Sequence, residues 1–548
     1  MTGEKFRALW PSLQDYRDLR TTWRRDLIAG LTVGIVALPL ALAFGVTSGV
    51  GAEAGLITAI VAGLVAAVFG GSNVQVSGPT GAMVVILAPI VVTYGPGAVI
   101  AVSVLAGLLV LAAGLLRLGR TVSYIPWPVV EGFTIGIGVI IFLQQVPAAV
   151  GAAGNSTNAV IAAGQAVAAA SWPQAWVPIT AVVVVAGIIV LCSRLAPRFP
   201  GSFLAIVVVT VLAVVVDAPL AQIGQLPASL PAPTIPELNL EMIRALAGPA
   251  VAVAALAAIE SLLSARVAAS ISRTGPFDAD RELVGQGLAS VAAGFFGGMP
   301  ATGAIARTAV NIRSGARTRL SAVVHALALL AVVYLAATVV SRIPLAALSG
   351  VLMVTAARMV SVRMIHLMLR STRSDATVFV ITAVVTISFD LVVAIVIGLA
   401  VAGFFALRAL SRASGVRRES IEGPALAGDE RIAVFRIDGA LFFGAVEQII
   451  DRVSAQEGID VVILRLSQLQ LVDASGARAL SELVQALEAR QVTVLIKGVR
   501  PEHLDLMHRL EVLSALRHRK HLFSDLPPAV AHARSHIRRL DHPDPTTG

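Results

Sequence analysis

The chain has 548 residues, of which 56% are hydrophobic and only 14% are charged, and its formal net charge is +9. This apolar composition excludes an ordinary soluble globular protein and places most of the chain in lipid. The basic residues lie mainly in short loops between apolar runs, and no nucleic-acid motif accompanies them, so we expect no nucleic-acid partner.

Residues 1–25 form the first predicted segment. They carry several Arg and Lys residues ahead of a full-length apolar run, and no small-residue cleavage site ends a short apolar region. A secretory signal peptide would have such a site. We therefore expect a cytoplasmic N-terminal segment.

Residues 26–410 contain the predicted membrane spans. The apolar runs are continuous and do not alternate with polar residues, so they predict transmembrane helices and exclude a β-barrel. We expect about fourteen spans, several of them short or interrupted by Gly and Pro. Basic residues fall in alternate loops, which predicts a multi-pass protein of the cell membrane with both termini in the cytoplasm.

An internal repeat links the two halves of this region. Thr80-Gly81-Ala82 recurs as Thr302-Gly303-Ala304, and in each copy a Pro close to the Thr interrupts an apolar segment too short to cross the bilayer. Two interrupted helices in corresponding positions predict a binding site near the middle of the membrane.

The chemistry of such helix starts favours an anion. A helix that begins inside the membrane directs unpaired N–H groups and the positive end of its dipole at whatever lies beyond it. The alternative is a pair of Gly/Pro kinks that serve only close packing. We favour the anion site because chance rarely repeats the motif at matching positions.

Two ionisable residues inside predicted spans are candidates for transport chemistry, since such residues are costly unless they face a cavity or a partner. Glu260 lies near the middle of its span and can carry a proton or help to hold a cation, or it can serve as a structural partner of an Arg. Ser264 lies one turn later on the same face and is a candidate ligand or a packing residue. Arg307, about one and a half turns beyond Thr302, adds positive charge to an anion site or extends to the inner membrane surface.

The sequence becomes more charged after the last apolar run. Residues 411–430 read as a charged linker, residues 431–535 as a small α/β domain of alternating strands and helices, and residues 536–548 as a flexible tail. Asp473 and Ser475 stand at a strand-to-helix turn, where either can cap the helix.

Several motifs together resemble the SulP family, also called solute carrier family 26. They are the two Thr-Gly segments, "PLALAFG" in the first span, "PWPVVEGFTIGIG", and "DASG" in the C-terminal domain. The resemblance covers nearly the whole chain. It implies an α-helical membrane protein with about fourteen helices in a 7+7 inverted repeat of core and gate domains, followed by a cytoplasmic STAS domain. It also implies a homodimer.

The resemblance assigns roles to individual residues by position. The implied anion site consists of Phe44, Thr80, Ala301, Thr302 and Arg307. The implied pair for a coupling ion is Glu260 and Ser264. In related STAS proteins the position of Ser475 is phosphorylated, which makes this residue a candidate regulatory site.

Within the family, the motifs look most like those of cyanobacterial sodium-dependent bicarbonate transporters. Those proteins have Asp where this chain has Glu260, and in bacterial members a Glu there is associated with proton-coupled uptake. The coupling ion is therefore H⁺ or Na⁺, and Na⁺ at Glu260 is the only metal we expect. The family's Gln in the first span is replaced by Leu40, and Arg307 matches the anion-site arginine of the animal members.

We therefore expect a secondary active transporter of a small inorganic anion of the sulfate or bicarbonate class, driven by protons or sodium and working by an elevator-type movement. The expected partners are the anion, the bilayer, a second copy of the chain and a cytoplasmic regulator of the STAS domain. The alternatives are a proton-coupled C4-dicarboxylate symporter, a nucleobase permease, and an uncoupled anion channel or STAS-based signalling anchor. No catalytic or cofactor motif is present, so we expect neither an enzyme nor a cofactor.

Overall fold

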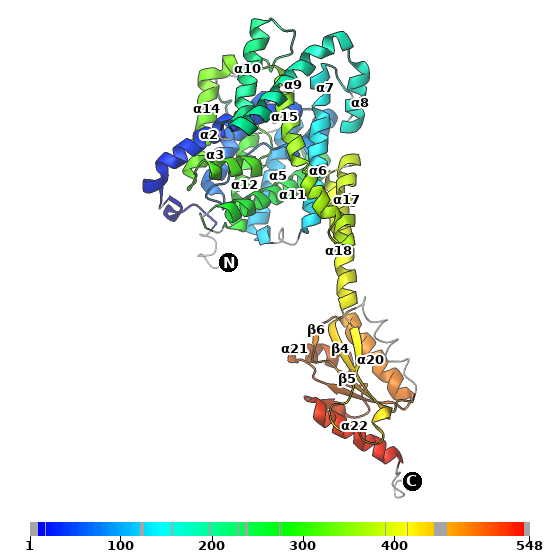
Figure 1. The fold of residues 1–548 in the computed structure, drawn as a ribbon. Helices are drawn as coiled ribbons and strands as arrows, with labels where there is room; N and C mark the ends of the chain where they lie inside the picture. Colours follow the sequence, from blue (N-terminus) through cyan, green and yellow to red (C-terminus); the bar gives the residue numbers. More distant parts are fainter. Residues whose placement is uncertain are drawn as a thin grey trace. The chain divides into compact units, whose positions relative to one another are not determined.

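The computed structural model describes residues 9–16, 18–120, 125–154, 156, 158–196, 199–226, 229–235, 239–272, 274–275, 277–389, 391–413, 415–442 and 458–541. The chain divides into two compact units, Met1–Leu399 and Ala400–Gly548. Figure 1 shows the first unit as helices and the second as a sheet with helices beside it. Parts of the predicted N-terminal segment, STAS domain and tail (residues 1–8, 17, 443–457 and 542–548) lie outside the described residues.

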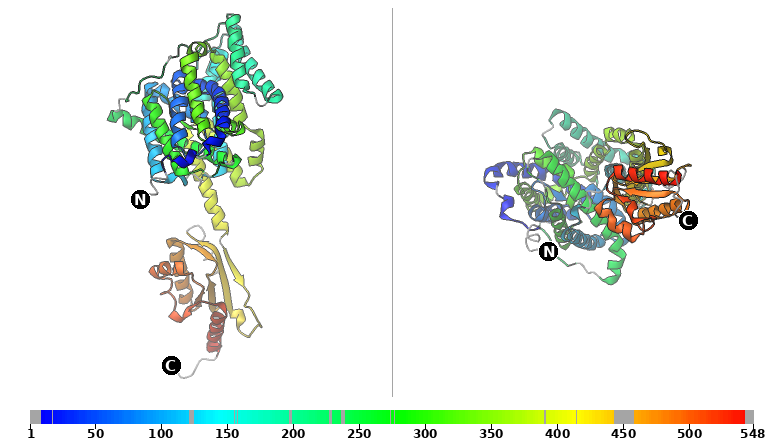
Figure 2. Two further views of the ribbon diagram at one scale, coloured as in Figure 1. Left: turned by 90° about the vertical axis from the view of Figure 1, so that its left-hand side faces the viewer. Right: turned by 90° about the horizontal axis from the view of Figure 1, so that it is seen from below.

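The first unit consists almost entirely of helices, which both views of Figure 2 show packed together as a bundle. In chain order they are η1 (Leu13–Tyr16), α2 (Leu19–Thr47), α3 (Ala52–Phe69), α4 (Gly81–Tyr94), α5 (Gly97–Leu115), α6 (Trp127–Gln144), α7 (Val146–Val150), α8 (Ala159–Ala169), α9 (Trp172–Leu195), α10 (Gly201–Val215), α11 (Leu240–Ile271), α12 (Ala279–Phe295), α13 (Ile305–Arg313), α14 (Leu320–Val340), α15 (Leu345–Met359), α16 (Val362–Leu369), α17 (Arg373–Ser388) and α18 (Leu391–Ala413), the last of which continues past residue 399.

Many of these helices are suited to a membrane. Within the described residues, nine helical stretches are long and apolar enough to span a bilayer: Leu19–Thr47, Ala52–Phe69, Gly97–Leu115, Trp127–Val150, Trp172–Leu195, Leu240–Ile271, Leu320–Val340, Leu345–Leu369 and Val393–Arg412. Shorter apolar helices, including α4, accompany them. The number of about fourteen spans stays a prediction. A search by length cannot test it, because interrupted helices such as α4 and α13 are too short to be recognised as spans.

Glycine lets the helices of the first unit approach one another closely. At the contact of α2 with α3, a Cβ added to Gly55 would lie 2.1 Å from the Ala41 carbonyl oxygen, and one added to Gly45 would lie 2.3 Å from the Gly51 carbonyl oxygen. Backbone therefore packs directly on backbone, which is how membrane helices associate when the hydrophobic effect gives them little help.

The first unit contains two very short strands, β1 (Ser77–Gly78) and β2 (Thr302–Gly303), which pair antiparallel. Ser77 lies opposite Gly303, and Gly78 lies opposite Thr302. Strand β2 lies within the second copy of the sequence repeat, and β1 ends two residues before the first copy. The two repeat segments are thus held together although more than two hundred residues separate them.

The second unit is built on a six-stranded sheet. Its strands are β3 (Gly415–Glu419), β4 (Ile432–Leu441), β5 (Val461–Arg465), β6 (Leu469–Val472), β7 (Thr493–Lys497) and β8 (Leu522–Phe523). The order is β3-β4-β5-β7-β8, and β6 pairs with β4 beyond a shift in register. Among the strands that the structure describes here, only β3 runs antiparallel to its neighbour.

Helices cover both faces of this sheet, namely α20 (Ala474–Ala489), α21 (Pro501–Arg509) and α22 (Leu526–Asp541). Alternate strand residues serve the two faces: Phe435 belongs to the core shared with α20 and α21, whereas Val434 belongs to the core shared with α22. Neighbouring residues of a strand point to opposite faces of the sheet, which explains this alternation. Because both faces are covered by helices, the strands are apolar at consecutive positions.

The predicted fold class is confirmed in this form, a mostly helical membrane domain followed by a small α/β domain. Strands and helices alternate in the second unit, as the sequence predicts for an α/β domain. The structure differs in the expected linker, residues 411–430, because β3 lies within it and pairs with β4. Charged side chains such as Arg417 and Arg418 concealed this edge strand, since charge at a sheet edge resembles charge in a loop.

The contact between α2 and α3 generates a prediction. Gly55→Ala should destabilise the first unit by about 1–3 kcal/mol, because the added methyl group meets backbone that cannot move aside. The measurement is the thermal unfolding midpoint of the purified protein in detergent. Gly187→Ala in α9 is the matched control, since no atom lies within 4 Å of its added Cβ. Equal midpoints for the two variants would contradict the close packing.

Candidate functional site

The candidate site is centred on the β1–β2 pair and the helices that follow it. Thr80 is the N-cap residue of α4, and Ala304 is the N-cap residue of α13. Strands β1 and β2 are antiparallel and a helix follows each, so two helices begin beside the place where the strands pair. We call this pair of strands the crossing. Neither N-cap side chain bonds a backbone N–H of its helix, so both helices start without a side-chain cap.

Local sequence explains why the helices begin here. Pro79 precedes Thr80 and Pro300 precedes Ala301, and a proline disfavours helical geometry in the residue before it and removes one N–H. Gly78 has φ +153°, and an added Cβ there would lie 2.7 Å from Arg307 Nη1. Glycine is therefore needed at this point of the crossing.

Buried hydroxyl groups satisfy the backbone of the crossing. Ser261 Oγ accepts the N–H of Gly303 at 3.0 Å, and Thr308 Oγ1 accepts that of Val76 at 3.0 Å. The N–H of Ala304 donates to the Val76 carbonyl at 2.9 Å. Lipid offers no hydrogen bonds, so irregular backbone at this depth depends on such partners.

Glu260 and Ser261, consecutive residues of α11, contact both halves of the repeat. Thr80 Oγ1 donates a hydrogen bond to Glu260 Oε2 at 2.9 Å. Ser261 Oγ lies 3.1 Å from Thr302 Oγ1. The hydroxyl of Thr80 is thus turned to the carboxylate, which is why it does not cap α4.

Arg307 supplies buried positive charge at the same place. Its side chain is 2% exposed, its Nη2 donates to the Pro79 carbonyl, and its Nη1 is buried without a hydrogen-bond partner. The charge of Arg307 also acts electrostatically on Glu260. Because Thr302 and Gly303 are extended, Arg307 is the third residue of α13 and lies in its first turn, not one and a half turns along it as the sequence suggested.

The remaining sequence-predicted residues lie around this centre. A Cβ added to Gly81, the first residue of α4, would lie 3.3 Å from Phe44 Cε1, so the Phe44 ring borders the start of that helix. The N–H and carbonyl of Ala301 both bond Ser290 Oγ, at 3.2 and 3.3 Å. Ser264 Oγ lies 3.4 Å from Thr308 Oγ1, so its contact in the structure is with α13.

The structure thus brings Phe44, Thr80, Glu260, Thr302 and Arg307 together from α2, α4, α11, β2 and α13. Their roles as anion or coupling-ion ligands stay predictions. Chemically, the arrangement combines two uncapped helix starts and a guanidinium with a carboxylate that a proton or a cation can neutralise.

The sequence analysis did not predict a hydrogen-bonded group of amide and carboxylate side chains on α12, next to β1. Gln286 Nε2 donates to Ser77 Oγ at 2.5 Å and to Glu282 Oε1 at 3.0 Å. Glu282 Oε2 accepts the N–H groups of Gly71 and Ser72 at 2.8 and 3.1 Å. The signal was available, since a Glu and a Gln four residues apart share one face of a membrane helix.

Ser475 and Asp473 lie in the second unit. Asp473 Oδ1 accepts the N–H of Gly476 at 2.7 Å, which confirms the predicted cap of α20. Ser475 is exposed in the first turn of that helix. Its modification stays a prediction.

Interrupted helices that meet inside a membrane domain are typical of membrane transport proteins. The sequence matches the Sulfate permease family over residues 23–382 and the STAS domain over residues 423–528. The chain belongs to the sulfate permease family, and the predicted resemblance to SulP proteins is confirmed.

Relatives with assigned names point the same way. YvdB of Bacillus subtilis, provisionally named a sulfate transporter, is 35% identical over 89% of this chain and 93% of its own length. The bicarbonate transporter BicA of Picosynechococcus sp. is 29% identical over 92% of each chain. The protein is thus a multi-pass member of a family of sulfate and bicarbonate transporters.

Solved structures support the fold. The transmembrane domain of a cyanobacterial bicarbonate transporter BicA matches with a TM-score of 0.63 and 31% identity, covering 70% of this chain and 98% of that chain. The murine solute carrier 26 family member A9 anion transporter, in its inward-facing state, matches with a TM-score of 0.85 over 98% of this chain and 95% of that chain. Its identity is 16%, so this second match shows the fold alone.

The contact of Ser261 with β2 generates a prediction. Ser261→Ala should lower the free energy of unfolding by about 1–3 kcal/mol, because it leaves the buried N–H of Gly303 without an acceptor. Thermal unfolding in detergent measures the effect. Ser193→Ala in α9, where an exposed hydroxyl bonds its own helix, is the control. If both variants unfold with the wild type, the Ser261 hydroxyl does not support the crossing.

Proposed function

We propose that this protein is a secondary active transporter of a small inorganic anion of the sulfate or bicarbonate class, driven by a proton or sodium gradient. The observation that carries the proposal is the buried Arg307 Nη1 without a partner, beside the uncapped starts of α4 and α13. An oxyanion accepts hydrogen bonds from a guanidinium and from free backbone N–H groups, and it is attracted by helix N-termini.

In this proposal Glu260 binds the coupling ion. Its carboxylate is half-buried, accepts a hydrogen bond from Thr80 and feels the charge of Arg307. A bound proton or Na⁺ reduces its repulsion of an incoming anion, which makes anion binding depend on the ion. This dependence distinguishes a coupled transporter from a passive pore.

The proposal includes movement and assembly. The crossing and its helices travel together past the rest of the membrane domain in an elevator-type cycle, in a homodimer of the cell membrane with cytoplasmic termini. Exposed Ser475 at the start of α20 is the proposed point of regulation, since a phosphate is stabilised by a helix N-terminus.

Uptake into proteoliposomes tests the transported anion and the coupling ion. Labelled bicarbonate, sulfate and fumarate are each offered with an inward proton gradient, an inward sodium gradient, or neither. We expect gradient-driven accumulation of sulfate or bicarbonate. Accumulation of fumarate alone would instead identify a dicarboxylate symporter, and equal uptake without a gradient would contradict coupling.

Glu260→Gln should abolish concentrative uptake while leaving part of the anion exchange. Gln keeps the size of the side chain and an acceptor for Thr80, but it cannot gain or lose a proton and has no charge to hold a cation. The measurement is accumulation and exchange of the same labelled anion. Glu241→Gln, an exposed site in the first turn of the same helix, is the control. A variant that concentrates the anion like the wild type would remove Glu260 from the mechanism.

Arg307→Ala should weaken anion binding about ten- to a hundredfold, which is the range for losing a hydrogen bond to a charged group. Calorimetric titration in detergent measures the affinity. Arg313→Ala, at the exposed end of α13, is the control for charge in the same helix. Arg307→Lys keeps a charge and should retain part of the affinity. Unchanged affinity in Arg307→Ala would leave the residue with a structural role only.

A further inference from the structure

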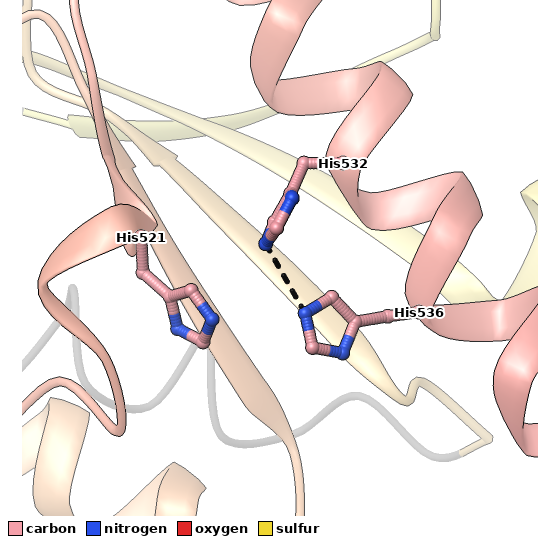
Figure 3. Close-up of side chains that lie close together, drawn as sticks. All are labelled: His521, His532 and His536. Atoms are coloured by element: carbon pink, nitrogen blue, oxygen red, sulfur yellow. Dashed lines mark hydrogen bonds between the residues drawn. The ribbon is translucent and has the colours of Figure 1, made fainter.

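Three histidines of the second unit lie together, far along the chain from the transport residues. His532 and His536 are four residues apart on α22, and His521 ends the short helix η4 (Arg519–His521) just before β8. Figure 3 shows the three rings facing one another, two from the helix and one from the neighbouring segment. The i, i+4 spacing places the two helical rings on one face.

The distances are those of ligands to one ion. A nitrogen atom from each ring lies within 4.8 Å of the other two, and His532 Nε2 lies 3.2 Å from His536 Nε2. Zn–N bonds of about 2.0–2.1 Å in a tetrahedral site separate two nitrogen ligands by about 3.3 Å. One pair therefore already has the required spacing, and small side-chain rotations bring in the third nitrogen.

The rings have the protonation state that metal binding requires. Burial lowers the pKa of His521 and His536 to about 4, and nearby positive charges act in the same direction. The pKa of His532 is lowered as well, first by burial and then by Arg539 and Lys520. At neutral pH the three imidazoles are neutral, and each can offer a nitrogen lone pair once the proton between His532 Nε2 and His536 Nε2 moves to the other nitrogen of its ring.

His521 shows an incomplete set of partners. Its side chain is 3% exposed, and its Nδ1 is buried without a hydrogen-bond partner. The backbone of Val494 hydrogen-bonds the same ring. Figure 3 shows the ring turned toward His532 and His536, and a backbone hydrogen bond on a histidine is one way to orient the ring on a metal.

We propose that His521, His532 and His536 bind one Zn²⁺ ion through their ring nitrogens, with the fourth position open to water or a small anion. Three histidines and an open position form a familiar zinc geometry. The ion joins α22 to the segment between α21 and β8. Zinc thus stabilises the docking of the last described helix on the sheet, independently of the transport site.

Positively charged side chains lie near the proposed zinc site. Arg517, Lys520 and Arg539 contribute positive charge near the three rings, which weakens cation binding and favours an anion as the fourth ligand. Aromatic packing among the histidines is the competing explanation, since their ring centroids lie 4.9–5.5 Å apart. Neither this packing nor the 3.2 Å hydrogen bond between His532 Nε2 and His536 Nε2 needs an ion, so bound metal distinguishes the two explanations.

Zinc binding to the full-length protein tests the proposal. The protein is purified in detergent without an oligohistidine tag, treated with a chelator, dialysed against Zn²⁺ and assayed for bound metal. We expect one Zn²⁺ per chain and a higher midpoint for unfolding of the second unit. Co²⁺ in the same site should give the intense visible absorption of tetrahedral coordination.

Variants locate the ion. His532→Gln and His536→Gln should each weaken Zn²⁺ binding more than about a hundredfold, since even loss of an outer-shell partner costs 10–100-fold. His508→Gln, an exposed histidine of α21, should bind like the wild type. Each variant's unfolding midpoint without metal shows whether it still folds. No stoichiometric zinc in the wild type, or equal binding by all variants, would overturn the proposal.

Discussion

The structure of the membrane domain depends on one constraint, namely that backbone interrupted inside a bilayer must find its hydrogen bonds within the protein. Two short strands, β1 and β2, pair with each other, and hydroxyl groups from α11 and α13 complete the set. This solution leaves the starts of α4 and α13 without side-chain caps. The strands of the crossing are therefore satisfied, whereas the helix starts beside them lack side-chain caps at the point where we propose that an anion binds.

The sequence predicted the positions of this crossing but not its geometry. The repeated Thr-Gly-Ala pattern located both interruptions, and a mid-span Glu260 marked the neighbouring helix. The strand pairing could not be predicted, because two residues carry no period and their partner lies in the other half of the chain. For the same reason Arg307 was placed too far along α13. Glu282 and Gln286 were missed because their partners are backbone and side chains from distant segments.

The second unit was easier to predict because its local signals agree with its fold. Buried strands such as β5 are continuous apolar runs, and α20 has a clear helical period and an Asp473 cap. The exception is β3, whose charged residues read as a linker. The histidine cluster was equally hidden, since His521 joins the His532 and His536 pair only once α22 packs on the sheet.

Helix α11 contacts both halves of the membrane domain. Its consecutive residues Glu260 and Ser261 touch Thr80 of one repeat and Thr302 of the other. In the transporter that we propose, the ion site and the anion site are therefore in hydrogen-bond contact and form a single thermodynamic system. Linkage then requires reciprocity: the factor by which the ion tightens binding of the anion equals the factor by which the anion tightens binding of the ion. Either solute alone leaves the carrier incompletely loaded, and cooperative loading limits leakage of the driving gradient.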